Sequence, residues 1–318
     1  MMKLFSIFGS KGFLVYFFLN FFLLKAGAWA APCCARNAAT PSLIVGDDRA
    51  QVNLGYSLAS AVAEAANDGS LSFFSSSTSD LSQVFRLDGS FLLSDRFQLG
   101  ASASWVKHFV SQWGLSDSVM GWGDSRLSLA YELIPVWSYS KWKPQVFVFS
   151  SLAFPTGRSK YEAENFLLAD IRGNGFYGIS LGGLVLKYWS SWDLFLLPEI
   201  HFSFPRQFQD QANSIYVYPR FGGSLGFGGG WNYKVFRFGV RIQPRLDQST
   251  VVILSNRTLQ MQTEGFLSVC DTGLDSSVLL SASDSLMLSY TDQTLLGVAM
   301  NLNVNRTIAL NFQHRWER

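Results

Sequence analysis

The sequence is short of charge, of cysteine and of long apolar runs. Charged side chains make up 15% of the 318 residues, whereas soluble domains carry about 25%. The three cysteines (Cys33, Cys34 and Cys270) lack the spacing of a metal site and are too few for a disulfide framework. No segment reaches the roughly 18 to 20 uninterrupted apolar residues of a membrane helix. These absences exclude an ordinary soluble enzyme, a disulfide-rich domain and a helical membrane protein.

The start of the chain has the features of a secretory signal peptide. In residues 1–30, Lys3 and Lys11 precede an apolar run over 13–24, and Ala28-Trp29-Ala30 is a small-x-small cleavage site. A transmembrane anchor is the alternative, but the run is too short for one. Cleavage after Ala30 removes three lysines and no acid, so the formal net charge falls from +2 to −1. Nucleic acid is excluded as a partner, because phosphate binding needs clustered basic side chains.

Residues 31–49 are predicted to be a periplasmic segment that precedes the folded domain. Cys33 and Cys34 could form a vicinal disulfide or simply decorate the N-terminus, and Pro32 disfavours lipidation of Cys33. The acidic pair Asp47-Asp48 could bind a cation. A turn with a local ion pair to Arg49, at the periplasmic mouth, is the preferred interpretation.

The rest of the chain spreads its apolar residues over short segments with a period of two. Segment 51–59 alternates apolar with polar or small residues, and 85–93 and 97–105 repeat the pattern around a tight turn. Similar segments are 127–133, 194–204, 221–231, 236–246, 286–290, 296–304 and 308–316, with a uniformly apolar run at 145–154 and a Gly-rich one at 177–189. Strands show each face every second residue, so about twelve strands (range 10–14) are predicted. Residues 247–283 are ambiguous.

A soluble β-sandwich or β-solenoid could also have this period, but three features favour a membrane barrel. The chain is predicted to be exported, and aromatic residues collect at strand ends. Tight turns (94–96, 190–193, 232–234, 291–293) alternate with long polar segments (60–82, 110–121, 155–175, 205–216). The prediction is therefore an all-β protein, a closed antiparallel transmembrane β-barrel over residues 50–318. It would lie in the bacterial outer membrane with both termini periplasmic.

The last predicted strand carries a further signal. Asn305-Arg306 is expected to turn the chain into it, and its apolar row ends at Trp316. This resembles the C-terminal aromatic signature that the insertion machinery of bacterial outer-membrane proteins reads, although Glu317-Arg318 follow the aromatic. The expected partners are outer-membrane lipid, lipopolysaccharide and the barrel-assembly machinery, the last through this strand.

A family resemblance rests on short motifs within 120–160. Gly121, Gly123 and Asp124 open a segment that ends at Tyr131-Glu132-Leu133, and Pro155-Thr156-Gly157 closes the next. This arrangement resembles that of the meta-pathway phenol-degradation family of outer-membrane proteins, which has FadL-like channel relatives. The resemblance implies an outer-membrane barrel that moves hydrophobic or aromatic compounds. In physical terms, Gly and Asp begin a strand and Pro-Thr-Gly opens a loop.

Charged residues fall on the predicted lumen face. Arg237, Arg241 and Arg245 are spaced by four and point the same way. The other predicted lumen residues are Arg86, Asp88, Asp124, Arg126, Glu132, Glu199, His201, Arg220 and Arg315. They could form an electropositive stripe for anionic solutes, or interior Arg–carboxylate pairs that fill and stiffen the barrel. The second interpretation is preferred, because the charges nearly balance.

Other features on this face have plain interpretations. Gly222, Gly226 and Gly228 could leave room for a solute, but a bend required by curvature is preferred. The loop 158–172 could cap the pore or meet lipopolysaccharide, and a solvated loop is the default. No nucleophile motif accompanies the three histidines, although His201 and Ser203 share a face. The sequence predicts no catalytic residues, no metal site and no cofactor.

The functional prediction is a passive channel or transporter for small, and in some cases hydrophobic or aromatic, molecules. A structural or surface-interaction barrel without transport is the first alternative, and an outer-membrane enzyme the last. The solute is unknown from sequence.

Overall fold

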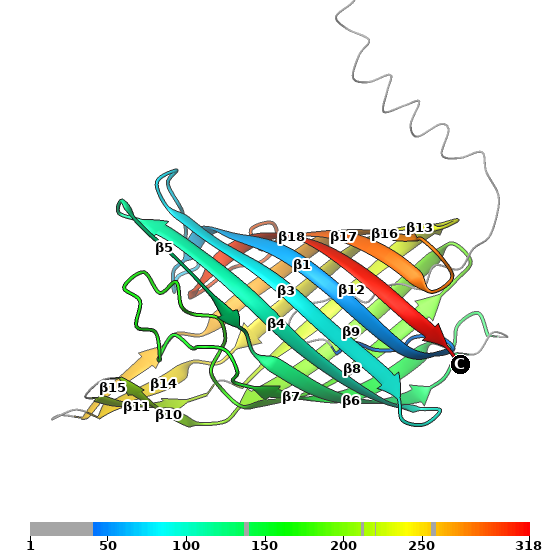
Figure 1. The fold of residues 1–318 in the computed structure, drawn as a ribbon, viewed down its shortest axis with the longest axis horizontal. Helices are drawn as coiled ribbons and strands as arrows, with labels where there is room; N and C mark the ends of the chain where they lie inside the picture. The colour runs from blue at the N-terminus through cyan, green and yellow to red at the C-terminus, as the bar shows by residue number, and fades with distance from the viewer. Residues whose placement is uncertain (1–40, 137–139, 211–212, 220, 256–258) are drawn as a thin grey trace, which may run out of the picture.

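The computed structural model describes residues 41–136, 140–210, 213–219, 221–255 and 259–318. The predicted signal peptide, Cys33, Cys34 and Arg220 lie outside these residues. Within them the chain forms a closed antiparallel barrel of twelve strands (Figure 1), because the first and last strands pair with each other. The barrel strands are β1 (Asp48–Ala65), β3 (Ser79–Leu92), β4 (Phe97–Gln112), β6 (Ser125–Ile134), β7 (Gln145–Phe154), β8 (Gly178–Tyr188), β9 (Trp192–Ser203), β12 (Phe221–Tyr233), β13 (Phe236–Asp247), β16 (Leu267–Leu279), β17 (Asp284–Asp292) and β18 (Leu302–Glu317).

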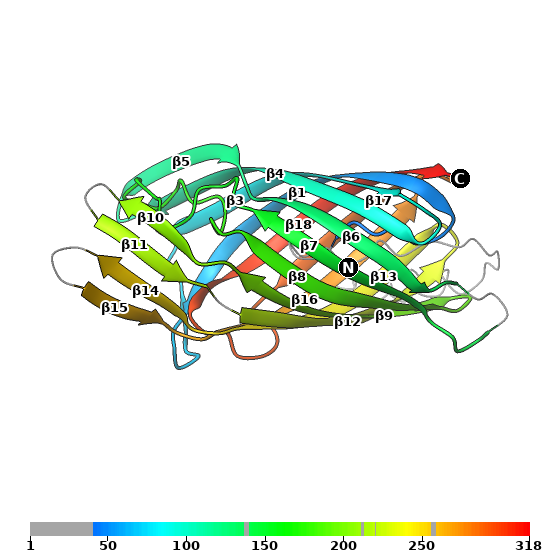
Figure 2. The ribbon, with the colours of Figure 1, turned by 90° about the horizontal axis from the view of Figure 1, so that it is seen from below.

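Six further strands lie at the end of the barrel opposite the C-terminus. β2 (Leu71–Phe73) pairs with β1, and β5 (Leu115–Trp122) pairs with β4. A separate four-stranded sheet projects from the same end (Figure 2) and consists of β10 (Arg206–Asp210), β11 (Asn213–Tyr218), β14 (Thr250–Ser255) and β15 (Leu259–Glu264). The predicted long polar segments are therefore partly strand, except for 155–175. No helix long and apolar enough to cross a membrane occurs in the part of the chain described.

The outward faces of the barrel strands form an exposed apolar surface. Leu54 on β1, Leu194 on β9 and Ile308 on β18 are 55%, 54% and 54% exposed, and their neighbours on the same faces are alike. A soluble protein rarely exposes a continuous apolar surface of this extent. In a bilayer the same surface contacts lipid, while the closed hydrogen-bond ladder satisfies the backbone.

The connections at the end that carries the C-terminus are short. They are 93–96, 189–191, 234–235 and 280–283, with one longer connection at 135–144. Three of the predicted tight turns (94–96, 190–193 and 232–234) fall at these positions. The fourth, 291–293, is wrong, because β17 continues to Asp292 and ends at the opposite mouth.

The predicted count of strands is confirmed, but two errors in the sequence analysis cancel. The predicted strand 296–304 is wrong: residues 293–301 are a loop in which Gly297 and Asn301 have φ of 80° and 58°. Asn305 and Arg306 do not turn the chain, since they pair with Ala61 and Ser60 inside the β1–β18 ladder. The missing strand is β16, which lies in the ambiguous stretch 247–283 together with the projecting β14 and β15.

Candidate channel lumen

The inward faces of the strands divide the lumen into a polar and an apolar part. Gln51 and Asn53 on β1 and Ser128 on β6 are buried polar side chains. On β7 and β8 the inward side chains are Phe147, Phe149, Leu184 and Leu186, which form one buried cluster with Leu197 of β9. The run 145–154 looked uniformly apolar in the sequence because one of its faces meets lipid and the other this cluster. The cluster is hereafter called the apolar wall.

Residues 41–46, hereafter the inserted segment, lie inside the barrel. The Gln51 side chain donates hydrogen bonds to Ser42 Oγ (2.8 Å) and to the Leu43 carbonyl (2.9 Å). The Gln98 side chain accepts a hydrogen bond from Ile44 N (2.8 Å) and donates one to the Ile44 carbonyl (2.8 Å). The barrel wall therefore satisfies the backbone of this segment much as a neighbouring strand would.

Apolar contacts add to this polar attachment. Leu43 is buried in the apolar wall, and Val45 packs against the same cluster. The inserted segment thus covers the apolar side of the lumen while it hydrogen-bonds to the polar side. Sequence analysis expected residues 31–49 to be a periplasmic segment with a turn at Asp47-Asp48, and no periodic signal in so short a stretch could have placed residues 41–46 inside the barrel.

The acidic pair that follows the inserted segment contacts the end of the chain. Asp48 lies 3.6 Å from the Arg315 guanidinium, and Asp47 lies 3.5 Å from that of Arg318. The register explains this, because Asp48 is directly opposite Glu317 in the barrel seam. The predicted local pair with Arg49 is replaced by two pairs with the last strand.

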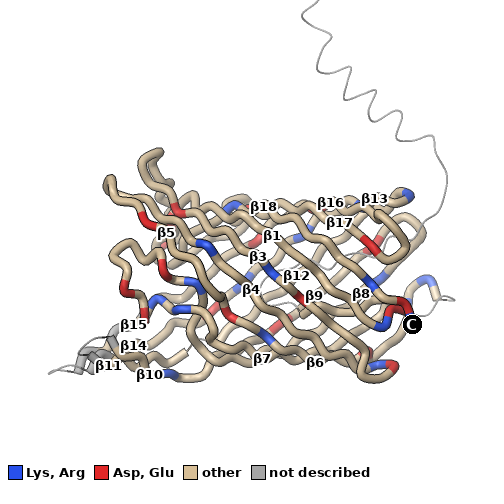
Figure 3. Tube along the Cα trace, in the orientation of Figure 1, with Lys and Arg blue, Asp and Glu red and all other residues tan. Residues whose placement is uncertain are grey.

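Charged residues occur along the barrel strands as well as in the loops (Figure 3). Among the basic side chains that the structure describes, the most buried is that of Arg237 on β13, at 2% exposure. Its guanidinium donates to Asp193 of β9 through Nε (2.9 Å) and Nη2 (2.8 Å), and to Asp275 of β16 through Nη1. Asn232 on β12 completes the group with a hydrogen bond to Asp193. The Arg237 cation therefore joins β13 to β9 and β16, and Asn232 adds β12 to the group.

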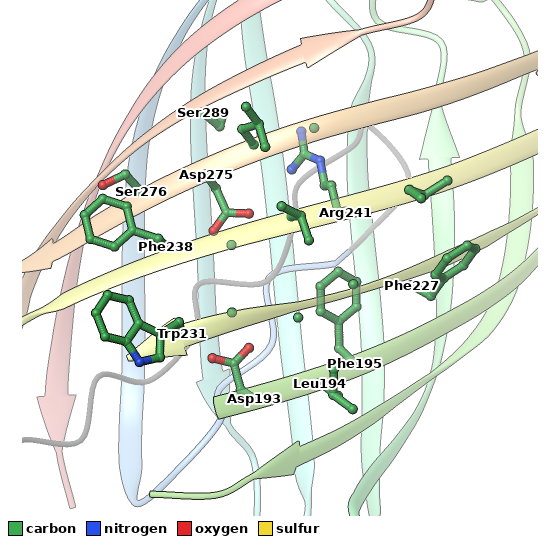
Figure 4. A pocket seen from close by; sticks show the side chains of 18 of the residues that line it. Asp193, Leu194, Phe195, Phe227, Trp231, Phe238, Arg241, Asp275, Ser276 and Ser289 are labelled. Atoms are coloured by element: carbon green, nitrogen blue, oxygen red, sulfur yellow. The ribbon is translucent and has the colours of Figure 1, made fainter. Parts of the chain in front are cut away.

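Arg241 and Arg245 continue this row but have different surroundings. Arg241 donates to Thr291 Oγ1 (2.6 Å), and Arg245 forms an ion pair with Asp247 (2.8 Å). Asp193, Asp275 and Arg241 can be followed in Figure 4. The hollow drawn there has a volume of about 1230 Å3. Outward-facing residues such as Leu194, Phe227 and Phe238 make up a large part of its border. The buried, inward-facing Asp193, Arg241 and Asp275 border the same hollow, so residues of both faces of the wall line it.

The remaining predicted lumen residues separate into small groups. Arg86 pairs with Asp88 at 2.8 Å, and Glu132 accepts a hydrogen bond from Gln145. His201 lies 2.9 Å from Asp247 and 3.9 Å from Glu199, both of which are buried. Arg315 donates to the Ala282 carbonyl at 2.9 Å. The structure thus joins Arg86, Arg237, Arg245 and Arg315 to carboxylates, whereas Arg126 and Arg241 have no such contact within the described residues.

Inward glycines provide room for these groups. A Cβ on Gly222 would lie 2.1 Å from Asp247 Oδ1 and 2.5 Å from His201 Nε2. A Cβ on Gly230 would lie 2.6 Å from the Arg237 guanidinium. These glycines therefore leave room for charged side chains of neighbouring strands to lie directly over the backbone on the inner face of the barrel. The sequence analysis did not consider this role.

The motif residues near 121–124 and 155–157 meet at the mouth opposite the termini. Asp124 Oδ1 accepts a hydrogen bond from Gly157 N (3.1 Å), and its Oδ2 accepts one from Asn174 N (2.7 Å). Thr156 Oγ1 donates to the Gly123 carbonyl at 2.6 Å. The motif therefore does more than begin a strand and open a loop: it attaches residues 155–177, hereafter the mouth loop, to the start of β6. Pro155 directly follows β7 and, without an N–H, ends its ladder.

The mouth loop lies on the inward side of β5. Gly121 is opposite the inward-facing Val106, and a Cβ on Gly121 would lie 1.9 Å from Arg172 Nη1. Arg172 also donates to the Met120 carbonyl at 2.7 Å. Glycine at this position therefore lets the Arg172 guanidinium rest on the inner face of the β4–β5 hairpin. Of the two loop interpretations in the sequence analysis, this geometry favours capping of the pore.

The far side of the mouth loop is anchored to the projecting sheet. Arg206 on β10 pairs with Glu162 at 3.0 Å and donates to the Gly175 carbonyl. Tyr161 and Phe176 pack on Phe208 with ring centroids 5.2 and 5.4 Å away. The mouth loop therefore bridges β5 and β10.

An acidic residue stabilises the mouth loop internally. Asp170 accepts hydrogen bonds from Arg158 (2.9 Å) and from Glu164 N (2.9 Å). Burial raises the pKa of Asp170, but these hydrogen bonds outweigh it and hold the pKa below its usual value. The contribution to loop stability is complete above the unfolded pKa, about 4, and is lost as pH falls through the folded one.

The chain is similar to known proteins in its fold and not in its sequence. No family model matches the sequence, and no curated protein matches it. Among solved structures, the chain is similar to the COG4313 outer membrane channel from Pseudomonas putida F1, with a TM-score of 0.62, 15% identity, and coverage of 89% of this chain and 100% of that one. The chain has the fold of an outer-membrane β-barrel. At this identity the likeness extends to the fold alone.

Two further matches have lower scores. The NanC porin aligns with a TM-score of 0.44 at 9% identity, over 83% of this chain and 98% of that one. A mutant of TodX, a monoaromatic hydrocarbon channel, aligns with a TM-score of 0.43 at 11% identity, over 86% and 91%. Neither score is high enough to carry an argument about this barrel.

All three histidines of the barrel contact an aspartate. His108 lies 2.8 Å from Asp80 inside the mouth, and His314 lies 2.7 Å from Asp284. His201 contacts Asp247, as described above. His314 also packs edge-on against Trp316, which agrees with an interfacial position near the end of the last strand. Each of the three rings thus has a carboxylate as its polar partner among the described residues.

Asparagine in place of Asp124 is expected to loosen the mouth loop. Burial raises the pKa of this carboxyl, yet both oxygens accept backbone hydrogen bonds. An amide can accept only one of them, and its NH2 would face a backbone N–H. The loss of about 1–3 kcal/mol should raise trypsin cleavage at Arg158, Lys160 and Arg172 by about fivefold or more. Cleavage rates of the purified protein in detergent measure this.

The matched control is Asp68→Asn in the β1–β2 turn. Asp68 also accepts hydrogen bonds from a neighbour, Ser70, but it has no contact with the mouth loop among the described residues. Its variant should be cleaved within 155–177 at the wild-type rate. Equal rates for Asp124→Asn and the wild type would show that Asp124 does not hold the loop.

Proposed function

We propose that this chain is a passive outer-membrane channel for small molecules and that the inserted segment closes it in the conformation described. The observation that carries the proposal is the placement of Leu43 and Ile44 inside the barrel. Leu43 and the adjacent Val45 cover the apolar wall, and the segment attaches through side chains of β1 and β4. Once the segment withdraws, a polar and an apolar lumen surface face each other, and a small molecule with an apolar part could pass between them.

The covalent connection of the inserted segment suits such a movement. It joins β1 through Gly46, whose φ of 115° lies outside the range that other residues readily adopt. β1 begins at Asp48, at the end with the short connections. In outer-membrane barrels the short turns are periplasmic. The segment can therefore leave through the periplasmic mouth without crossing the wall.

The proposal includes the wider context of the barrel. The motif 121–124 with 155–157 supports kinship with the meta-pathway phenol-degradation family and hence a hydrophobic or aromatic solute. Export by residues 1–30, contact with lipopolysaccharide at the mouth loop, and insertion by the assembly machinery through β18 belong to the same proposal. So does the absence of catalysis.

Planar-bilayer conductance tests the channel directly. The wild-type protein should give rare, brief openings, and a variant with residues 42–45 replaced by Gly-Ser-Gly-Ser should conduct steadily. Heat-modifiable migration in detergent gels should be unchanged, which shows that the variant barrel is intact. If the replaced variant is folded but gives no conductance, the lumen is sealed by its own side chains and the barrel is structural.

A further inference from the structure

Arg126 is placed inside the barrel without a counter-ion in contact. It is opposite Ser102 of β4 and Ala153 of β7, two small residues that leave space beside its side chain. Within the described residues its guanidinium has no hydrogen bond and no ion pair. Five N–H donors in a fixed planar arrangement are therefore available to a ligand.

The neighbouring charges are already paired. Arg86 is bound to Asp88, and Arg245 to Asp247. Glu199 and Asp124 are the acids whose charge reaches Arg126, but neither is within ion-pair distance of it. The carboxylate of Glu199 instead accepts a hydrogen bond from Ser224 at 3.4 Å and lies 3.9 Å from His201. Arg126 is thus a cation without an ion pair in the part of the chain described, with Glu199 and Asp124 as the nearby acids.

A small void adjoins the Arg126 side chain. Ser42 of the inserted segment, Asp88, Ser128 and Ser151 share its border with Arg126. Ser151 Oγ is buried and has no hydrogen-bond partner in the part of the chain described. A second unused donor therefore lies beside the guanidinium, and buried donors without partners are uncommon in folded proteins.

We propose that Arg126, assisted by Ser151, binds the carboxylate of a small organic monoacid on its way through the lumen. The planar guanidinium and a carboxylate match in a bidentate pair, which is among the strongest hydrogen-bonded arrangements. Because Asp88, Glu199 and Asp124 lie near Arg126, they repel a dianionic phosphate about twice as strongly as a group with one negative charge, so the site favours the monoanion.

The apolar wall suggests what the rest of the solute resembles. Going down β7 toward the terminal mouth, the inward residues after Ala153 are Ser151, Phe149 and Phe147. A molecule whose carboxylate is on Arg126 would lay its body along this row once Leu43 withdraws. The solute class is therefore an acid with an apolar, ring-sized body. This inference rests on the proposed function, because Leu43 must withdraw before the body of the solute can enter, but binding is measured separately from conductance.

Calorimetric titration of the full-length protein in detergent with benzoate tests the site. Saturable binding is expected for the wild type, with affinity reduced about tenfold or more in Arg126→Gln. Arg126→Lys should keep part of the affinity, because the charge remains without the bidentate geometry. Arg306→Gln is the matched control, since Arg306 is paired with Asp292 away from the lumen residues described above. Heat-modifiable migration verifies that each variant is folded.

The outcomes separate this site from the channel proposal. Inorganic phosphate that competes equally with benzoate, or benzoate affinity unchanged in Arg126→Gln, overturns the site. Bilayer measurements with potassium benzoate then address passage. A protein that binds benzoate through Arg126 but never conducts retains the site and loses the channel, whereas one that conducts benzoate equally with and without Arg126 retains the channel and loses the site.

Discussion

Replacing Arg237 by alanine is expected to lower the free energy of unfolding of the barrel by about 3–5 kcal/mol. The Arg237 guanidinium binds Asp193 and Asp275, whose side chains are 1% and 6% exposed. Without the cation, two buried carboxylates remain with no charge to balance them. Most of the loss comes from this desolvated negative charge, because a buried ion pair as a whole contributes little net stability.

Urea unfolding of the barrel in detergent, followed by tryptophan fluorescence, measures the effect. The matched control replaces the whole group by apolar residues, as Arg237→Met with Asp193→Leu and Asp275→Leu. This triple variant should recover most of the stability, since no charge is left buried. A loss of less than about 1 kcal/mol in Arg237→Ala would show that the pair behaves like an exposed one.

Truncating Leu43 to alanine is expected to favour the open channel by a factor of about 30. Leu43 is buried in the apolar wall when the inserted segment is in place and exposed to water when it withdraws. Losing the burial of its isobutyl group weakens the closed state by about 2 kcal/mol, which is about thirtyfold in the closed-to-open ratio. Open probability in planar bilayers is the measurement.

Leu54→Ala provides the matched control for this prediction. Leu54 is a leucine only a few residues away on β1, but it points outward and is 55% exposed. Its variant should open no more often than the wild type. If both variants behave like the wild type, the inserted segment does not limit conductance, and the obstruction lies in the mouth loop or the wall.

The fold was predictable because the outward face of every barrel strand must be apolar whatever the lumen contains. This constraint produces the period of two over segments such as 51–59 and 236–246, and the structure shows barrel strands there. Outside the bilayer, alternation of apolar and polar residues does not indicate a barrel strand. Val298, in the loop 293–301, is 55% exposed and lies against Gly69 of another loop, yet it continues the alternation.

The lumen was predictable only in part. Parity along a strand indicates which side chains point inward, but which of them meet depends on the register between strands that are distant in sequence. Asp193 and Asp275, the partners of Arg237, were not among the predicted lumen residues. Asp193 is in phase with Glu199 and His201, so parity could have found it, whereas Asp275 lies in the ambiguous stretch. The inserted segment and the loop attachment at Asp124 depend on tertiary contacts that no local pattern encodes.

The seam between β1 and β18 has a consequence for assembly. Its pairs extend from Asp48 with Glu317 to Ala65 with Leu302. The first barrel strand in the sequence therefore gains its second neighbour only from the last one. Until then two unpaired edges exist, which hydrocarbon does not tolerate and which invite association between chains. Contacts of such high sequence separation also form slowly. We therefore expect the barrel to close only once β18 is available to β1, and a chain truncated before Leu302 to remain without a closed barrel.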